Sequence, residues 1–219
     1  LRYTRGGFGT PFFGADRQVR VEHGRLVVQD GMEARDTEIT SITAAAAFVG
    51  VEPGTEAQEH DSPPLGDVDA PLGADPLVGE FLGAWFGFSW AVLEELRLTP
   101  DAVDVGRPQL WPGHFDPALE MGPVDAGRAT YGCSPGDADH DEPYLYVAAW
   151  GEIDRRDVFW NSESFNGGSL PYAELRAAAD PFAAALGFFR AGYRRLVSPA
   201  GGWSRSSSST SRPRSPRSR

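Results

Sequence analysis

His114 and Asp116 form the first candidate site, because they stand two positions apart in the segment Gln109-Leu-Trp-Pro-Gly-His-Phe-Asp116. On an extended chain such residues project to the same side, while Phe115 faces the other way. An imidazole beside a carboxylate suits a shared metal ion, or a general base with its orienting group. Pro117 predicts that the strand ends there or lies at a sheet edge. A simple His–Asp hydrogen bond at a strand end is the alternative.

The segment 134–142 is the second candidate site. It contains four carboxylates and an imidazole within six residues, namely Asp137, Asp139, His140, Asp141 and Glu142. The alternating aspartates match the opening of an EF-hand loop, but Glu142 stands where a glycine must turn the chain, and Ala148 stands where the closing acid belongs. This argues against an EF-hand and leaves a looser divalent-metal site or, as the alternative, a solvated acidic turn.

The two segments are expected to face each other and to share one ligand. The candidate metal ligands are His114, Asp116, Asp137, Asp139, His140 and Asp141. If the site is catalytic, His114 would act as general base, Asp116 would orient it, and Glu142 would act as acid. Tyr144, Tyr146 and Trp150 on the following strand are the candidate ligand-binding side chains.

Strands are predicted to position these segments. In the stretch 144–150, Leu145, Val147 and Ala149 alternate with the three aromatic residues, so one side faces the core and the other the site. This stretch belongs to a second strand group over 109–160. The first group is a β-meander over 18–22, 25–29 and 32–39, with turns at His23-Gly24 and Asp30-Gly31; the Asp-Gly pair is typical of a type I′ turn.

Two longer helices are expected to begin at Asp75-Pro76 and Asp180-Pro181, where an N-cap acid precedes proline at the first helical position. Their apolar faces comprise Val78, Phe81, Leu82, Trp85, Val92 and Leu96 in the first helix, and Phe182, Ala185, Leu186, Phe189, Tyr193 and Leu196 in the second. A short helix capped by Thr40 or Ser41 ends near Gly50. Because strands and helices do not alternate as βαβ units, we predict an α+β fold with mainly antiparallel pairing.

The charge of the chain is negative and unevenly distributed. The net charge is −11, all 20 basic residues are arginines, and five of them lie in 204–219, which leaves 15 against 31 acids in 1–203. A surface of formal charge −16 repels phosphate backbones, so we expect the folded body to bind no nucleic acid. The chain is interpreted as a single globular domain over 1–203, with an acidic loop at 51–74, and a disordered Ser/Arg-rich tail over 204–219.

The compartment is inferred from the apolar runs, the N-terminal segment and the cysteine count. The longest apolar run without a charge, 81–93, has 13 residues, whereas a membrane-spanning helix needs about 20. No N-terminal run combines the features of a signal peptide. The single cysteine, Cys133, excludes an intramolecular disulfide and fits a reducing compartment. We therefore expect a soluble cytoplasmic protein with no membrane partner.

Four segments carry a resemblance to a known family: 109–116, Tyr131-Gly-Cys-Ser-Pro-Gly-Asp137, Glu142-Pro-Tyr-Leu-Tyr146 and Leu170-Pro-Tyr-Ala-Glu-Leu175. Together they resemble a family of uncharacterised proteins from GC-rich bacteria, over about Gly6 to Leu196. Family members usually have an aliphatic residue where this chain has Pro117, and the Ser/Arg tail has no counterpart. The resemblance implies the boundaries of the fold and no particular activity.

Three functions fit the sequence. The favoured one is a binding domain for a polar small molecule or a divalent cation at the two candidate segments. The second is a hydrolase-type enzyme that uses His114 and Asp116. The third is a structural or interaction protein whose apolar helix, 76–97, contacts a partner. Only the enzyme requires a pocket with a perturbed carboxylate, and only the third requires an exposed apolar patch.

Overall fold

The computed structural model describes residues 1–54 and 64–197, and in this part of the chain it contains two antiparallel five-stranded sheets and four helices. The N-terminal sheet runs in chain order through β1 (Arg2–Thr4), β2 (Gly7–Gly9), β3 (Arg17–Glu22), β4 (Arg25–Asp30) and β5 (Glu33–Glu38). The C-terminal sheet has the order β10 (Gly167–Pro171), β9 (Tyr144–Ala149), β8 (Ala129–Ser134), β7 (Asp116–Met121), β6 (Gln109–Trp111). The helices are α1 (Ile42–Val49), α2 (Pro76–Leu96), α3 (Tyr172–Ala177) and α4 (Pro181–Val197). The predicted α+β fold with its N-terminal meander is confirmed.

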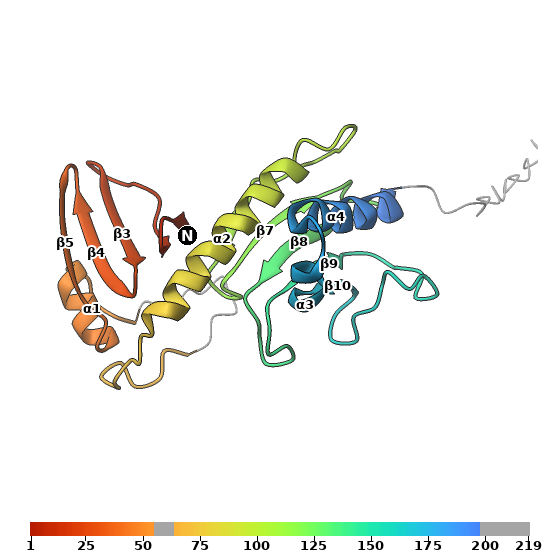
Figure 1. The fold of residues 1–219 in the computed structure, drawn as a ribbon. Coiled ribbons are helices and arrows are strands. Elements are labelled where there is room, and N and C mark those ends of the chain that lie inside the picture. Colours follow the sequence, from red (N-terminus) through yellow and green to blue (C-terminus); the bar gives the residue numbers. More distant parts are fainter. Residues whose placement is uncertain (55–63, 198–219) are drawn as a thin grey trace, which may run out of the picture.

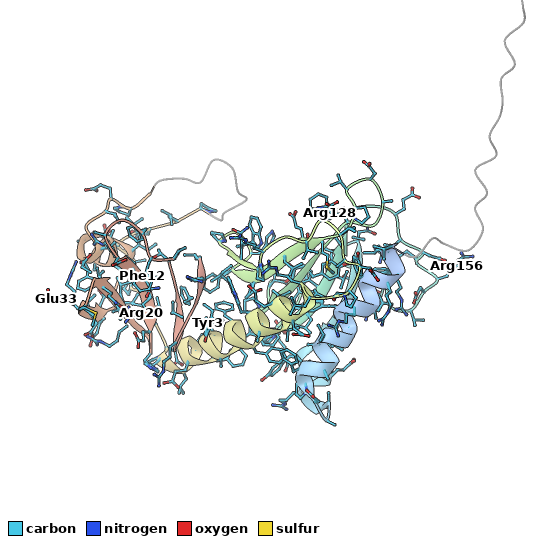
Figure 2. All side chains as sticks on the ribbon, turned by 90° about the horizontal axis from the view of Figure 1, so that it is seen from above. Tyr3, Phe12, Arg20, Glu33, Arg128 and Arg156 are labelled. Atoms are coloured by element: carbon cyan, nitrogen blue, oxygen red, sulfur yellow. The ribbon has the colours of Figure 1, made fainter. Side chains whose placement is uncertain are left out.

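Helix α2 joins the two sheets (Figure 1). The N-terminal sheet lies at the beginning of α2, and the C-terminal sheet lies beside its remainder, together with α3 and α4. From above, Arg20 and Glu33 mark one end of the molecule, and Arg128 and Arg156 mark the other (Figure 2). Close approach of the N-terminal sheet depends on Gly83, because a Cβ there would lie 2.4 Å from the backbone nitrogen of Gly7.

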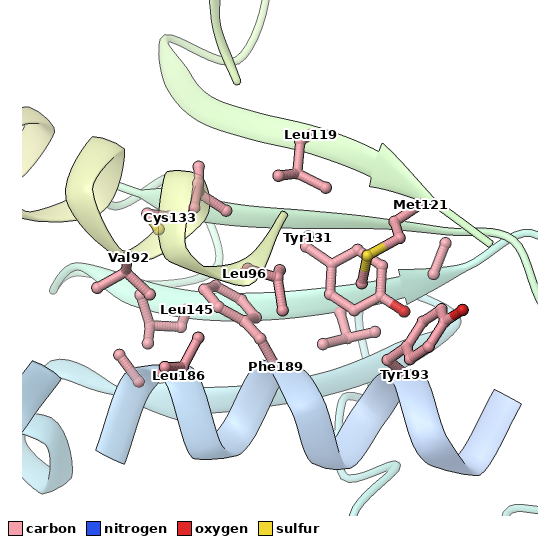
Figure 3. Packing of buried hydrophobic residues seen from close by; sticks show 14 of the residues in the cluster. Val92, Leu96, Leu119, Met121, Tyr131, Cys133, Leu145, Leu186, Phe189 and Tyr193 are labelled. Carbon is pink, nitrogen blue, oxygen red and sulfur yellow. The ribbon is translucent and has the colours of Figure 1, made fainter. Parts of the chain in front are cut away.

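The core lies between one face of the C-terminal sheet and helices α2 and α4 (Figure 3). Phe189 of α4 packs against Tyr131 of β8, and Leu96 of α2 is fully buried beside them. The indole of Trp85 donates a hydrogen bond of 3.2 Å to the carbonyl of Cys133, which ties α2 to β8. The helices thus cover only one face of this sheet.

The helix starts and caps agree with the sequence. Asp75 caps α2 by accepting a hydrogen bond from the Leu77 amide at 2.8 Å, and Asp180 likewise accepts from Ala183 at 3.0 Å. Ser41 caps α1, which ends at Gly50 with a φ of 84°. Short polar side chains at these positions satisfy amides that have no partner within the helix.

Two local predictions are wrong. The β4–β5 turn is centred on Gly31 and Met32 rather than on Asp30 and Gly31, since Asp30 pairs with Glu33. Of Asp30 and Gly31, only Gly31 has a positive φ, whereas both residues of the His23-Gly24 turn do. On α2, Val78 and Phe81 are 54% and 39% exposed rather than buried, because the helix turns its small residues toward the N-terminal sheet.

Helix α2 is long and apolar enough, by length and composition alone, to cross a membrane, and 33% of that stretch is buried. A core helix passes the same test, and Phe86, Val92 and Leu93 of α2 are completely buried. The predicted acidic loop lies partly outside the described residues, and the predicted tail lies wholly outside them.

Candidate functional site

The face of the C-terminal sheet opposite the helices carries the candidate site. Alternation along β7, β8 and β9 sends Leu119, Tyr131 and Leu145 into the core. The intervening residues line a cavity on the other face: Asp116 and Glu120 from β7, Thr130 and Ser134 from β8, and Tyr144, Tyr146 and Ala148 from β9. We call this the sheet-face cavity. The floor of the cavity is therefore polar, whereas the opposite face of the sheet is apolar.

The sheet-face cavity has a volume of about 610 Å³. Its walls come from Trp111 at the end of β6 and from three loops: Gly113 and His114 in the β6–β7 turn, Asp137 and Asp139 after β8, and Ser164 and Phe165 before β10. The two candidate segments are separated by some twenty residues of chain. The structure thus brings His114 and Asp116 into one lining with Asp137 and Asp139.

Tyr146 and Asp116 form the floor of the cavity. The Tyr146 hydroxyl donates a short hydrogen bond to Oδ2 of Asp116, two strands away. Between them lies Gly132 of β8, which pairs directly with Tyr146. A Cβ at Gly132 would lie 2.2 Å from Cζ of Tyr146. The glycine therefore leaves the space through which the tyrosine ring crosses β8 to reach the aspartate.

Asp116 is unusually buried for a carboxyl group, with 2% of the residue exposed. Burial raises its pKa above the ordinary value, because a low-dielectric environment disfavours the charged form. The hydrogen bond from Tyr146 and the nearby His114 act in the opposite direction and offset part of this rise. Burial, together with Asp116, also raises the pKa of Tyr146 well above its usual range. A buried carboxyl with a raised pKa in a cavity is a pattern typical of functional sites.

The segment 109–116, predicted as one strand, instead consists of β6, a turn and the first residue of β7, which corrects the alternation argument. Trp111 pairs with Asp116, so residues 112–115 form the turn, and Phe115 has a φ of 53°. The Phe115 ring packs edge-on against the rings of Phe8 and Phe86, with centroid distances of 4.7 Å and 5.3 Å respectively. This packing fixes the turn from behind, while His114 lies at the cavity. Between His114 and Asp116, both of which the structure describes, there is no hydrogen bond.

Pro117 also differs from expectation. It lies inside β7, is buried, and pairs with Leu110 of β6 rather than ending the strand. The sheet edge is formed by the short strand β6, so the proline stands one strand inward.

The acidic segment after β8 folds into a tight turn around Asp137. His140 Nδ1 lies 2.9 Å from Oδ1 of Asp137, and the Tyr144 hydroxyl donates to Oδ2 at 2.5 Å. The His140 ring stacks on Tyr144 with 4.2 Å between centroids. Partial burial opposes ionisation of Asp137, but the hydrogen bonds from Tyr144, His140 and the Asp139 amide outweigh it, so the pKa is lowered. Asp137 is thus a carboxylate already engaged by its neighbours.

Four predicted site residues lie outside the lining. Asp141 and Glu142 are exposed, and His140 stacks on Tyr144 without lining the cavity. Trp150 is 56% exposed and donates from its indole to Thr130, while the Arg128 guanidinium lies over its ring. The hydrogen bond to Thr130 puts Trp150 on the cavity face of the sheet, just past the end of β9 at Ala149 and outside the lining itself.

Among the described residues, no group of three or more His, Cys, Asp or Glu side chains lies close enough to hold a metal ion. The physical reason is that the acids are spread around the cavity rather than clustered. Asp116 bonds to Tyr146, and Asp137 bonds to Tyr144 and His140. The carboxylates and imidazoles predicted as metal ligands therefore share a cavity only in part, and form no coordination group.

Several lining residues were not predicted from the sequence: Trp111, Gly113, Glu120, Thr130, Ser134, Ser164 and Phe165. Glu120, Thr130 and Ser134 carry a detectable signal, since each is a polar residue alternating with buried apolar ones on β7 or β8. Ser164 and Phe165 lie in an irregular loop without any periodicity, so only the tertiary structure places them.

No protein-family model, curated protein or solved structure matches this chain.

Proposed function

We propose that this chain is a binding domain for a polar small molecule, held in the sheet-face cavity. The observation that carries the proposal is a hollow, polar sheet face with the buried carboxyl of Asp116 at its floor. Burying a carboxyl raises its pKa and costs stability, so its place in a cavity favours a role beyond folding. The volume of about 610 Å³ falls in the range of about 300–1,000 Å³ typical of small-ligand sites.

The lining suits a ligand that carries polar groups and also has an apolar face, either a ring or an aliphatic group. Tyr144, Tyr146 and Phe165 supply apolar surface in an aromatic series, with ring centroids about 6 Å apart. Thr130 and Ser134 supply hydroxyls between these rings and the β7 acids. A few polar groups set among aromatic side chains are what fixes the orientation of a small ligand.

The hydrolase alternative has less support. Glu142, its candidate acid, is exposed outside the cavity lining. His114 makes no hydrogen bond to Asp116, so a base and its orienter are not paired. Asp116 with its raised pKa is the one feature of the alternative that survives. The family resemblance and a cytoplasmic location without a membrane partner remain part of the proposal. The acidic composition supports only the expectation that the chain binds no nucleic acid.

A blocking variant tests the proposal. Ala148 lies on the cavity face of β9, so Ala148→Tyr fills the cavity with a side chain. Val158→Tyr is the control, because Val158 is 90% exposed and outside the lining. We expect polar fragments to raise the thermal midpoint of the wild type and of Val158→Tyr, and to leave Ala148→Tyr unchanged. A library without any ligand for the wild type, or ligands that stabilise all three proteins equally, would contradict the proposal.

A further inference from the structure

The charged groups around the sheet-face cavity point to the class of its ligand. We infer that the cavity selects an organic cation, such as a primary amine, guanidine or quaternary ammonium group attached to a small apolar body. The inference rests on the proposed binding function. It draws on three features: the charge of the lining, the electronic state of its tyrosines, and the way its acids are distributed.

The lining carries four acids and no arginine, in a chain that has no lysine. The nearby Arg128 is committed elsewhere: its guanidinium donates to Glu120 at 2.8 Å and to the Gly122 carbonyl at 3.1 Å, and its carbon lies 5.1 Å from the Trp150 ring centre. Glu120 is thereby neutralised. Asp137 has the His140 imidazole at 2.9 Å and no arginine, and Asp139 is not paired with an arginine either. An anionic ligand would meet uncompensated negative charge at the cavity wall.

The tyrosines strengthen the preference for a cation. The hydroxyls of Tyr144 and Tyr146 both donate to carboxylates, to Asp137 and Asp116 respectively. A phenol that donates its proton toward an anion carries more negative charge on its ring, so the ring face attracts a cation more strongly. His140 already covers one face of Tyr144. Tyr146 and the nearby Phe165 ring, whose centroids are 5.9 Å apart, therefore offer the aromatic surface for a cationic group.

A bare metal ion fits the same charge less well than an organic cation does. No three ligating side chains of the described residues converge on one point. A metal ion needs oxygen or nitrogen ligands at about 2.0–2.6 Å in a compact shell. An ammonium or guanidinium group instead needs carboxylates at hydrogen-bond distance on one side and aromatic faces on the other. The cavity, with acids on its walls and aromatic rings beside them, provides the second arrangement.

Three probes of equal size and different charge test the inference: benzylamine, benzyl alcohol and benzoate. Binding to the full chain is followed through tryptophan fluorescence, since Trp111 lines the cavity, and is located by amide chemical shifts of β9. We expect benzylamine to bind at least about tenfold more tightly than benzyl alcohol, with benzoate weakest, which corresponds to about 1.4 kcal/mol for the charge.

Matched variants assign the effect to the cavity. Asp139 and Asp141 are both exposed acids of one turn, but only Asp139 lines the cavity. We expect Asp139→Asn to weaken benzylamine several-fold, by about 0.5–1 kcal/mol for one partly exposed charge, and to leave benzyl alcohol unchanged. Asp141→Asn should change benzylamine binding by much less. Tyr146→Leu should weaken benzylamine as well, which tests the aromatic contribution separately.

The outcomes separate this inference from the proposed function. If benzyl alcohol or benzoate binds in the cavity as tightly as benzylamine, the cavity remains a binding site and the preference for a cation is wrong. The same follows if Asp139→Asn and Asp141→Asn behave alike. If none of the three probes, and no member of the polar fragment library, shifts the β9 amides, the proposed binding function fails and the inference fails with it.

Discussion

Replacing Tyr146 with phenylalanine would remove one hydroxyl from the floor of the sheet-face cavity and leave the ring over Gly132. The hydroxyl donates to Asp116, which is only 2% exposed, so water cannot readily replace it. Loss of one partner from a buried hydrogen bond costs about 1–3 kcal/mol, toward the upper end where the remaining partner is charged. We therefore expect Tyr146→Phe to lower the free energy of unfolding by about 2 kcal/mol at neutral pH.

The cost of Tyr146→Phe should increase with pH. Burial raises the pKa of Asp116, and the hydrogen bond from Tyr146 lowers it, which means that the bond stabilises the ionised carboxyl more than the neutral one. Without the hydroxyl, the pKa of Asp116 rises further. The destabilisation is then smallest below the pKa of Asp116 in the wild type. It increases with pH until the pKa of the variant is exceeded.

Urea unfolding at a series of pH values measures this cost. The matched control is Tyr144→Phe, which removes a hydroxyl that donates to Asp137 at 2.5 Å. The Asp137 side chain is 42% exposed, so water can replace the lost donor, and we expect a cost below about 1 kcal/mol. A double-mutant cycle of Tyr146→Phe with Asp116→Asn isolates the interaction between the two side chains.

Three results would refute this reasoning. The first is an equal cost for Tyr146→Phe and Tyr144→Phe, because burial would then not decide the energy. The second is a cost of Tyr146→Phe that stays constant or falls as the pH rises. The third is an interaction energy near zero in the double-mutant cycle, which would show that the hydroxyl stabilises the fold through some contact other than Asp116.

Other substitutions test the same structure at different points. Gly132→Ala should displace the Tyr146 ring and lower the thermal midpoint. Adding Tyr146→Phe to this variant should then cost less stability than it does in the wild type. Strictly additive costs would contradict the passage of the Tyr146 ring over Gly132. Because folding raises the pKa of Asp116, the wild type loses stability as the pH rises from the unfolded-state pKa of this carboxyl through its folded-state pKa. The free energy of unfolding of Asp116→Asn, measured with urea, should therefore increase relative to the wild type as the pH rises. A decrease would show that burial does not raise the pKa of Asp116. Trp85→Ala should cost about 3–5 kcal/mol, because the indole is buried and bonded to the Cys133 carbonyl. A Trp85→Ala protein that stays stable and instead loses self-association in sizing chromatography would favour an interface on α2.

Local patterns in the sequence predicted the elements well wherever one cause dominated. Asp75 and Asp180 each stand before a proline, and each caps a helix, because the capping carboxylate and the fixed φ of proline act within a few residues. The alternation in 144–149 correctly separated Leu145 and Val147 from the tyrosines, since the period of a strand fixes which face each side chain takes.

Prediction failed where the backbone left a regular conformation. The interpretation of 109–116 as one strand assumed a period of two through Phe115, but Phe115 has a positive φ, held by its packing against Phe8 and Phe86. Phe8 and Phe86 lie far from Phe115 in the sequence, so no local sequence pattern predicts this packing.

The sequence alone determined which residue types were present, which faces of the strands were polar, and where the helices begin. These features depend only on residues that are close neighbours in the sequence. Only the tertiary structure decided that Asp116 is buried beneath Tyr146, that Gly132 opens the space between them, and that the acids line one cavity without forming a metal-binding group. Those features arise from antiparallel register across three strands, in which contacts join residues up to thirty positions apart. Side-chain distances of a few ångströms then decide the chemistry, and residue spacing along the chain does not fix them.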